Sequence, residues 1–352
     1  MSSIIYLNFY SSINPTIKYS ITSFDLDYTI IKTKSGNIFP KDKNDWVLWD
    51  EQVKKKFTEI SKIPNNLIVI FSNQKGVGSG NKKFTTVNEF KQKINDIHKL
   101  LSVDFIFVAS LEDDIYRKPR PGMFDFIQNK LSIKINKKNS IYVGDMAGRP
   151  NDKYDTDLKF ALNLKIKFMT PEEYFLNEPN NKIKLSGYLL NNNSLNTKLS
   201  IKPESNQMII ISGYPGSGKS HLAEKFTKNY EFEIFSRDNL GNKFMKKLIE
   251  SLENGNPVVI EGLYWNNETR KELKNLADKH KYNTTYILVK TSYELAYHLN
   301  LYRSLYEDKN KVPEIVYMKY RKHFEYPDES DWGKIIEYHP RVPKKVNKYY
   351  LY

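Results

Sequence analysis

The sequence predicts two α/β units in one chain, each built around a mainly parallel sheet. In both halves, short apolar runs that are too brief for helices alternate with longer amphipathic segments. A polar, Asn-rich stretch separates the halves, and each half carries a motif directly after an apolar run. Because active sites of parallel sheets form beyond the carboxyl ends of the strands, we expect one site in each half.

The expected elements follow this alternation. In the first half we predict strands over 19–27, 66–73, 103–110 and 140–145, with a helix over 87–101. In the second half we predict strands over 207–213, 257–262 and 284–290, with helices over 219–229 and 269–281. The predicted domains are therefore 1–176 and 207–352, joined by a linker over 177–206 that contains two prolines.

Composition narrows the class of partner. The 352 residues include 55 basic and 41 acidic side chains, a net charge of +14. This excess favours polyanions such as nucleic acid, although compositional drift would produce it too. There is no cysteine, which excludes disulfides, and the six histidines show no zinc-binding spacing. Without a signal peptide or a long apolar run, we expect a soluble, intracellular protein with no membrane partner, nuclear or cytoplasmic.

The segment "GYPGSGKS" in the second half predicts a phosphate-binding loop. It follows a predicted strand and opens a predicted helix, which is the context that GxxxxGKS requires. Backbone amides at the helix N-terminus can surround nucleotide phosphates, Lys219 can bridge them, and Ser220 can bind Mg²⁺. The predicted nucleotide-binding residues are Gly213, Tyr214, Pro215, Gly216, Ser217, Gly218, Lys219 and Ser220.

Further residues of the second half suit transfer of a phosphoryl group to a hydroxyl. Asp238 in "FSRDNLG" can accept the proton of that hydroxyl, or it can cap the helix that follows. Arg237 suits a substrate phosphate or a solvated surface position. Arg303, on a predicted helix, can close over the transferred phosphate, although the sequence alone leaves this role open.

The first half carries Asp25-x-Asp27-x-Thr29 at the end of a predicted strand. Two carboxylates one residue apart suit a nucleophile that forms an aspartyl-phosphate and an acid that later acts as a base, while Mg²⁺ screens the charge. An Asx-type turn is the structural alternative for so short a motif. Three later residues favour the chemistry, each near a predicted strand end: Ser72 for a phosphate oxygen, Lys118 for the transferring phosphoryl group, and Asp145 as a metal ligand besides Asp25 and Asp27.

Both halves resemble one family, the polynucleotide kinase 3′-phosphatases, with the phosphatase ahead of the kinase. The resemblance covers about 20–176, through "FSNQKGVGSG", "YRKPRPGM" and "VGDMAGRP", and about 208–341, through "GYPGSGKS", "SRDNLG" and "HLNLYRSLYE". It implies a haloacid-dehalogenase-like phosphatase domain followed by a P-loop kinase domain. It also implies Asp238 as the base for a 5′-hydroxyl, Arg303 as a lid arginine, and substrate contacts from Arg117, Arg237 and Arg321.

The same resemblance implies the substrates. They would be ATP, used with Mg²⁺, and DNA carrying 3′-phosphate and 5′-hydroxyl ends, which a ligase could seal after both steps. The basic charge would then attract the phosphate backbone. We expect a monomer, and no phosphopeptide-binding domain ahead of the phosphatase, because the resemblance begins near residue 20.

Two departures from the family pattern leave alternatives open. Tyr28 stands where the family commonly has glycine, and "EGLYWNN" after Glu261 replaces a common Asp-Asn-Thr-Asn. The rewritten loop could shift the acceptor to RNA or tRNA ends. A DNA-end-binding module without catalysis is a second alternative, and a metabolite phosphatase fused to a nucleoside kinase is a third.

Overall fold

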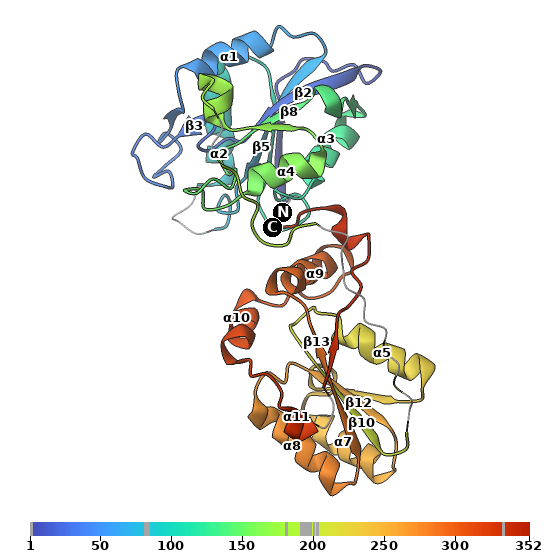
Figure 1. The fold of residues 1–352 in the computed structure, drawn as a ribbon. Coiled ribbons are helices and arrows are strands. Elements are labelled where there is room, and N and C mark those ends of the chain that lie inside the picture. Colours follow the sequence, from blue (N-terminus) through green and yellow to red (C-terminus); the bar gives the residue numbers. More distant parts are fainter. Residues whose placement is uncertain are drawn as a thin grey trace. The chain divides into compact units, whose positions relative to one another are not determined.

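The computed structural model describes residues 3–80, 85–179, 182–190, 199, 201, 204–332 and 335–352. It divides into two compact units, one formed by Met1–Leu189 with Lys348–Tyr352 and the other by Leu190–Asn347 (Figure 1). Parts of the predicted linker, namely 180–181, 191–198, 200 and 202–203, lie outside the described residues.

The unit boundaries differ from the predicted domain ranges at the end of the chain. Lys348–Tyr352 groups with the first unit, whereas the predicted second domain extends to residue 352. The physical reason is burial: the Leu351 side chain is 1% exposed, and the backbone of Tyr350 is hydrogen-bonded to the Asn163 side chain. No local sequence pattern indicates that these last residues pack with the first unit and not with the second.

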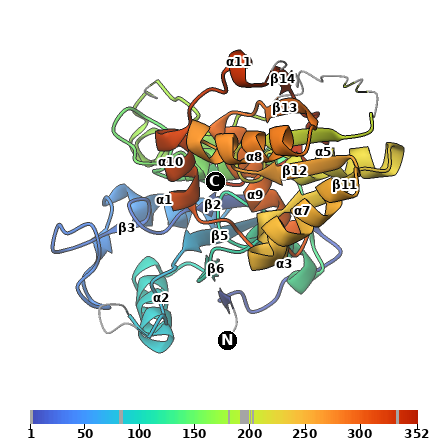
Figure 2. The same cartoon turned by 90° about the horizontal axis from the view of Figure 1, so that it is seen from below.

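The first unit is a doubly wound sheet in the order β1-β6-β5-β2-β8-β9, with β7 beside β2. Figure 2 shows β2, β5 and β6 in succession. All its strand pairs are parallel except β1 with β6. The strands are β1 (Ile4–Asn8), β2 (Lys18–Phe24), β5 (Asn66–Asn73), β6 (Ile106–Ser110), β7 (Lys134–Ile135), β8 (Ile141–Val143) and β9 (Lys167–Met169), and a separate antiparallel pair joins β3 (Ile31–Lys32) to β4 (Val47–Leu48).

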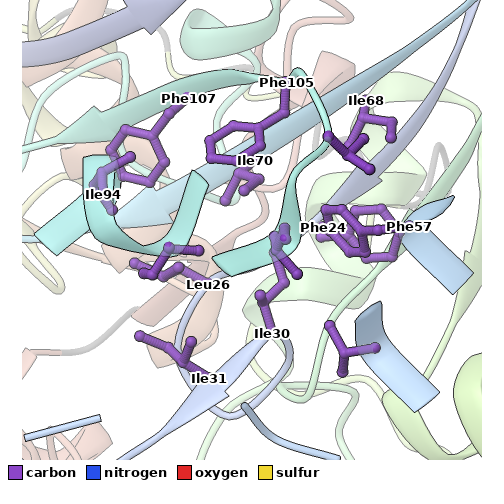
Figure 3. Close-up of a cluster of buried hydrophobic side chains, with 14 of the residues drawn as sticks. Phe24, Leu26, Ile30, Ile31, Phe57, Ile68, Ile70, Ile94, Phe105 and Phe107 are labelled. Atoms are coloured by element: carbon purple, nitrogen blue, oxygen red, sulfur yellow. The ribbon is translucent and has the colours of Figure 1, made fainter. Parts of the chain in front are cut away.

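Helices cover both faces of this sheet because the strands alternate apolar side chains between the faces. Ile68 and Ile70 of β5 face α1 and α2, where they join Phe57 and Ile94 in one core (Figure 3). Leu67, Val69 and Phe71 belong to the opposite core, with residues of α3 and α4. The helices are α1 (Gln52–Ile60), α2 (Val87–Leu101), α3 (Gly122–Leu131) and α4 (Thr156–Leu164), with the short helices η1 (Lys137–Asn139) and η2 (Glu172–Leu176).

The second unit is a parallel sheet in the order β11-β12-β10-β13-β14. Its central strand β10 places Ile209 and Ile211 against α5 and places Met208 and Ile210 against α7 and α8. The strands are β10 (Gln207–Ser212), β11 (Glu233–Ser236), β12 (Val258–Gly262), β13 (Asn283–Val289) and β14 (Ile335–Tyr338). The helices are α5 (Lys219–Asn229), α6 (Arg237–Leu240), α7 (Phe244–Glu253), α8 (Asn267–Lys279), α9 (Tyr293–Tyr306), α10 (Glu314–His323) and α11 (Glu329–Trp332), with η3 (Gly241–Lys243) and η4 (Val346–Lys348).

The predicted fold class, two α/β units with mainly parallel sheets, is confirmed. Within the described part of the chain, no helix combines the length and the apolar character that crossing a bilayer demands.

Candidate active sites

The predicted residues of the first half meet at the carboxyl edge of the first sheet. Asp25 directly follows β2, Ser72 lies at the end of β5, and Asp145 comes two residues after β8. These strands are neighbours and parallel, so their carboxyl ends share one edge. One cavity there is lined by Asp25, Asp27, Tyr28, Ser72, Asn73, Arg117, Lys118, Asp145, Met146, Tyr154, Thr156 and Asp157.

Lys118 is a buried cation that lines this cavity. Its side chain is almost fully buried, and its Nζ lies 2.6 Å from Asp25 Oδ1 and 2.9 Å from Asp157 Oδ1. The loop that carries it is fixed by Asn73, whose Nδ2 donates to the Lys118 carbonyl while its Oδ1 accepts from the Lys118 amide. The ammonium group therefore has a defined position beside Asp25.

Asp157 belongs to the site, and the sequence reasoning missed it. One oxygen of its carboxylate forms a group with one carboxylate oxygen each of Asp25 and Asp145, and these three atoms all lie within 4.8 Å of one another. It accepts hydrogen bonds from the Tyr142 hydroxyl and the Met146 amide. The available signal was an acidic residue in the first turn of the helix that follows the Asp145 strand.

Gly144 makes room for this third carboxylate. A Cβ at this position would lie 2.5 Å from the Asp157 Cγ, which is closer than real Cβ contacts. The glycine is therefore needed for its small size, because the turn after β8 passes directly against the Asp157 side chain.

Burial and the nearby negative charges make the carboxyl groups of Asp25 and Asp145 hard to ionise. Burial raises the pKa of Asp25 to about 7, although the Lys118 ammonium opposes this and the Asp157 charge adds to it. Burial, with the charges of Asp157 and Asp25, raises the pKa of Asp145 to about 9. A divalent cation would offset this repulsion, and oxygen ligands suit a hard cation. The three carboxylates therefore fit a divalent metal ion.

The Asp27 carboxylate lies apart from this group of three. Its Oδ2 accepts a hydrogen bond of 2.6 Å from Gln74 Nε2, and its Oδ1 lies 4.0 Å from the buried Lys93 Nζ. The Gln74 amide also donates to Ser72 Oγ, at 2.8 Å. These contacts hold Asp27, the residue predicted to act as acid and base, at the cavity wall. Its side chain remains 41% exposed.

Tyr28 and Arg117 line the same cavity. Tyr28 adopts a left-handed backbone conformation, with φ at 56°, and its hydroxyl donates to the carbonyls of Asn37 and Ile38. The Arg117 Nη1 is buried and has no hydrogen-bond partner among the described residues, which leaves it available to an anionic ligand.

The predicted phosphate-binding loop of the second unit joins β10 to α5. Its glycines at 213, 216 and 218 all have positive φ, and a Cβ at Gly216 would approach the Ala296 carbonyl oxygen to 2.9 Å. The Lys219 Nζ lies within the loop and donates to the carbonyls of Gly213 and Tyr214. Burial lowers the pKa of Lys219 to about 8, while the Glu261 charge opposes this shift.

Beside this loop, the Ser220 hydroxyl and the Glu261 carboxylate form another group of oxygen atoms that could bind a cation. Ser220 Oγ donates to both carboxylate oxygens of Glu261, at 3.0 and 2.9 Å. Glu261 is on β12, the parallel neighbour of β10, so the two strands bring the acid to the first turn of α5. This hydroxyl and this carboxylate are ligand types that Mg²⁺ uses in nucleotide sites.

Asp238 does not cap a helix in the structure. Ser236 occupies the cap position of α6, and Asp238 is an exposed residue of its first turn. The Asp238 charge contributes to the pKa of Lys219, so the two groups lie close enough to interact. The alternative interpretation of Asp238 as an N-cap is therefore wrong.

The three arginines predicted in the second unit have different environments. Arg237 is exposed, pairs with Glu272 at 3.5 Å and lies over the Phe244 ring. Arg303, on α9, has a buried Nε without a hydrogen-bond partner among the described residues, and its charge opposes protonation of Lys219. Arg321 is exposed on α10, and its charge acts on the Tyr214 hydroxyl.

The rewritten loop after Glu261 encloses a tyrosine. Tyr264 has a positive φ of 35°, and a Cβ at Gly262 would lie 2.6 Å from the Tyr264 ring. Its hydroxyl is buried without a hydrogen-bond partner in the described part of the chain. Burial is the main cause that raises the Tyr264 pKa; the Arg237 charge opposes this shift, and the charges of Glu261 and Asp238 add to it.

Comparison with known proteins identifies relatives of the chain. A sequence model of the family "Polynucleotide kinase 3 phosphatase" matches residues 20–175. The "Bifunctional polynucleotide phosphatase/kinase" of Schizosaccharomyces pombe is 34% identical over 98% of this chain and 84% of its own length. The "Polynucleotide 3'-phosphatase" of Saccharomyces cerevisiae is 31% identical over 44% of this chain and 87% of its own length.

The alignment with the Schizosaccharomyces pombe protein covers nearly the whole chain and most of that protein's length. This similarity is sufficient to assign the chain to a family. The chain belongs to the family of bifunctional polynucleotide phosphatase/kinases.

Proposed function

We propose that this protein removes the 3′-phosphate and phosphorylates the 5′-hydroxyl at the ends of a broken DNA strand. The observation that carries the proposal is the buried Lys118 Nζ, 2.6 Å from Asp25 in a cavity that is also lined by the carboxylates of Asp27, Asp145 and Asp157. The matching activities in the names of relatives support it.

The first unit would carry the phosphatase. An oxygen of Asp25 attacks the phosphorus, the bond to the 3′-oxygen breaks, and Asp27 gives that oxygen its proton. Asp27 then takes a proton from the water that attacks the aspartyl-phosphate, and inorganic phosphate leaves as the Asp25 carboxylate is restored. Lys118 and Ser72 would contact phosphate oxygens, and Arg117 would contact the substrate.

A divalent cation, which we assign as Mg²⁺, would be held by Asp25, Asp145 and Asp157. When bound, it supplies positive charge that lets the anionic carboxylate approach an anionic phosphate. Lys118 would also supply positive charge that lets the carboxylate approach the phosphate, because its ammonium group lies beside Asp25.

The second unit would carry the kinase. Asp238 takes the proton of the 5′-hydroxyl, whose oxygen attacks the γ-phosphorus of ATP as the bond to ADP breaks. The loop residues 213–220 surround the phosphates, and Lys219 and Arg303 stabilise their developing charge. Ser220, with Glu261 next to it, would hold the Mg²⁺ that accompanies ATP. Arg237 and Arg321 would contact the nucleic acid.

The two activities are compatible because they act on opposite ends. Together they produce a 3′-hydroxyl and a 5′-phosphate, which a ligase can join, so the protein would act before the ligation step. It would act as a monomer. The net charge of +14 supports a nucleic acid as the substrate. RNA ends remain the second candidate, because the loop after Glu261 departs from the family pattern.

Matched oligonucleotides test this proposal. Phosphate release is measured from DNA and RNA strands with 3′-phosphate ends, and transfer from labelled ATP is measured with 5′-hydroxyl ends. The proposal expects both activities and a higher kcat/KM on DNA. A higher kcat/KM on RNA would assign RNA as the substrate, and binding without either activity would identify an end-binding module.

A further inference from the structure

The first unit contains a short segment that lies far from residues 1–189 in the sequence. Residues 350–352 follow the second unit in the chain, yet they are built into the first. Asn163 Oδ1 accepts from the Tyr350 amide and Asn163 Nδ2 donates to the Tyr350 carbonyl, both at 2.8 Å. Arg120 Nε donates to the Leu351 carbonyl at 3.1 Å. The segment is thus held through its backbone.

The same two side chains contact the loop that carries Lys118. Asn163 Nδ2 also donates to the Pro119 carbonyl, at 2.8 Å. Arg120 lies two residues after Lys118, and its Nη1 bonds Asp113 and the Asp114 carbonyl, so it fixes the start of this loop to its end. The Asn73 side chain also bonds the backbone of Lys118. The 350–352 segment therefore completes the support of the loop.

Burial makes these contacts hard to replace. The side chains of Arg120, Lys159 and Leu351 are all nearly inaccessible to solvent. Lys159 Nζ donates to the Tyr352 carbonyl at 2.8 Å and to the Ser186 carbonyl at 2.9 Å, besides its ion pair with Asp155. Without the segment, the buried donors of Arg120, Lys159 and Asn163 would each lose an acceptor, which is unfavourable.

We propose that residues 350–352 are a positioning element of the phosphatase site, which holds the 118–120 loop so that Lys118 Nζ faces Asp25. The inference rests on the proposed phosphatase function and adds to it a part of the chain outside 1–189. Small displacements of a reacting group can reduce a rate by about 100-fold. Displacing the segment should therefore lower kcat for 3′-phosphate release while KM changes little.

The test uses Leu351→Lys in the full chain. A charge at this buried position expels the segment, because an unpaired ammonium is costly to bury. Leu351→Met, which keeps apolar volume, is the conservative variant, and Tyr352→Phe is the matched control. The latter loses only the hydroxyl that accepts from the Tyr188 amide and keeps the backbone contacts to Arg120 and Lys159.

We expect Leu351→Lys to lower the phosphatase kcat by about 10- to 100-fold at temperatures well below its unfolding midpoint, with KM within about threefold. Leu351→Met and Tyr352→Phe should behave like the wild type, and the kinase of the same molecules should not change. Unchanged phosphatase kcat in Leu351→Lys would overturn the inference. Parallel loss of both activities would also overturn it, since it would show general destabilisation. Wild-type protein without phosphatase activity would instead refute the proposed function.

Discussion

At the scale of single residues, Tyr28 shows how a departure from a family pattern is accommodated. A side chain in the left-handed region is less stable by about 1–2 kcal/mol, which is why glycine is common at such turns. Here the Tyr28 hydroxyl donates to the carbonyls of Asn37 and Ile38, and the backbone amide donates to the Ile31 carbonyl. These bonds offset the strain and tie the 37–38 loop to the cavity.

Tyr28→Gly should therefore retain phosphatase activity. The strain it relieves is worth about 1–2 kcal/mol and the hydrogen bonding of the hydroxyl that it loses about 1 kcal/mol, so we expect the free energy of unfolding to change by no more than about 1 kcal/mol. Because the hydroxyl bonds the loop and not the catalytic acids, kcat should stay within about threefold of wild type. Steady-state kinetics and urea denaturation check both values, with Tyr28→Phe as control. A loss of kcat above about tenfold would show that the ring acts on the substrate.

The crowded carboxylates predict how metal binding depends on pH. Burial raises the pKa of Asp25 to about 7 and of Asp145 to about 9, so both retain protons at pH values where free carboxyls have lost them. A cation must displace these protons, and its affinity should rise with pH by about tenfold per unit for each proton displaced, levelling above about pH 9.

Calorimetric titration of Mg²⁺ into the nucleotide-free protein at several pH values measures this dependence. Asp145→Asn removes one carboxyl and should reduce the slope. An affinity that does not change between about pH 6 and pH 9 would contradict the assignment of these carboxylates as ligands.

At the scale of elements, the site depends on how the turn after β8 meets the start of α4. Gly144 lies in that turn, and a Cβ there would overlap the Asp157 side chain. We expect Gly144→Ala to displace Asp157 and to lower the phosphatase kcat by about 100-fold. Kinase assays on the same variant provide the control, and phosphatase activity at the wild-type level would refute a role for Asp157.

The sequence predicted some elements well and others only in part. The periodic segments at 87–101 and 219–229 are helices with the predicted bounds, because their apolar spacing is strong. The helix predicted over 269–281 spans Asn267–Lys279, since Asn266 accepts from the Thr269 amide and caps it earlier. Edge strands β1 and β14, which have few buried residues, were not predicted.

The residues of the sites were predicted where they follow strands in sequence. Asp25, Ser72, Lys118 and Asp145 line one cavity, as their order along a parallel sheet implies. Asp157 and the contacts of residues 350–352 were not, because they depend on how a helix start and a distant segment return to the sheet. Local patterns carry no information about the return of residues 350–352, and for Asp157 they offer only an acidic residue in the first turn of a helix.

At the scale of the whole molecule, the chain carries the residues of two proposed active sites, one in each of two compact units. The first has a buried lysine among carboxylates, and the second has a lysine within a glycine-rich loop. Each unit has its own sheet and its own buried cores. We therefore expect that a substitution in one site can abolish one activity and leave the other intact.

The most direct test uses one DNA strand with a 5′-hydroxyl and a 3′-phosphate, incubated with ATP and Mg²⁺. Because the gain and loss of a phosphate leave the mass unchanged, each end is resolved by fragmentation or by an end label. Wild-type protein should convert both ends, Asp25→Asn only the 5′ end, and Lys219→Ala only the 3′ end. If either variant loses both conversions, or if wild-type protein binds the DNA and converts neither end, two independent active sites are contradicted.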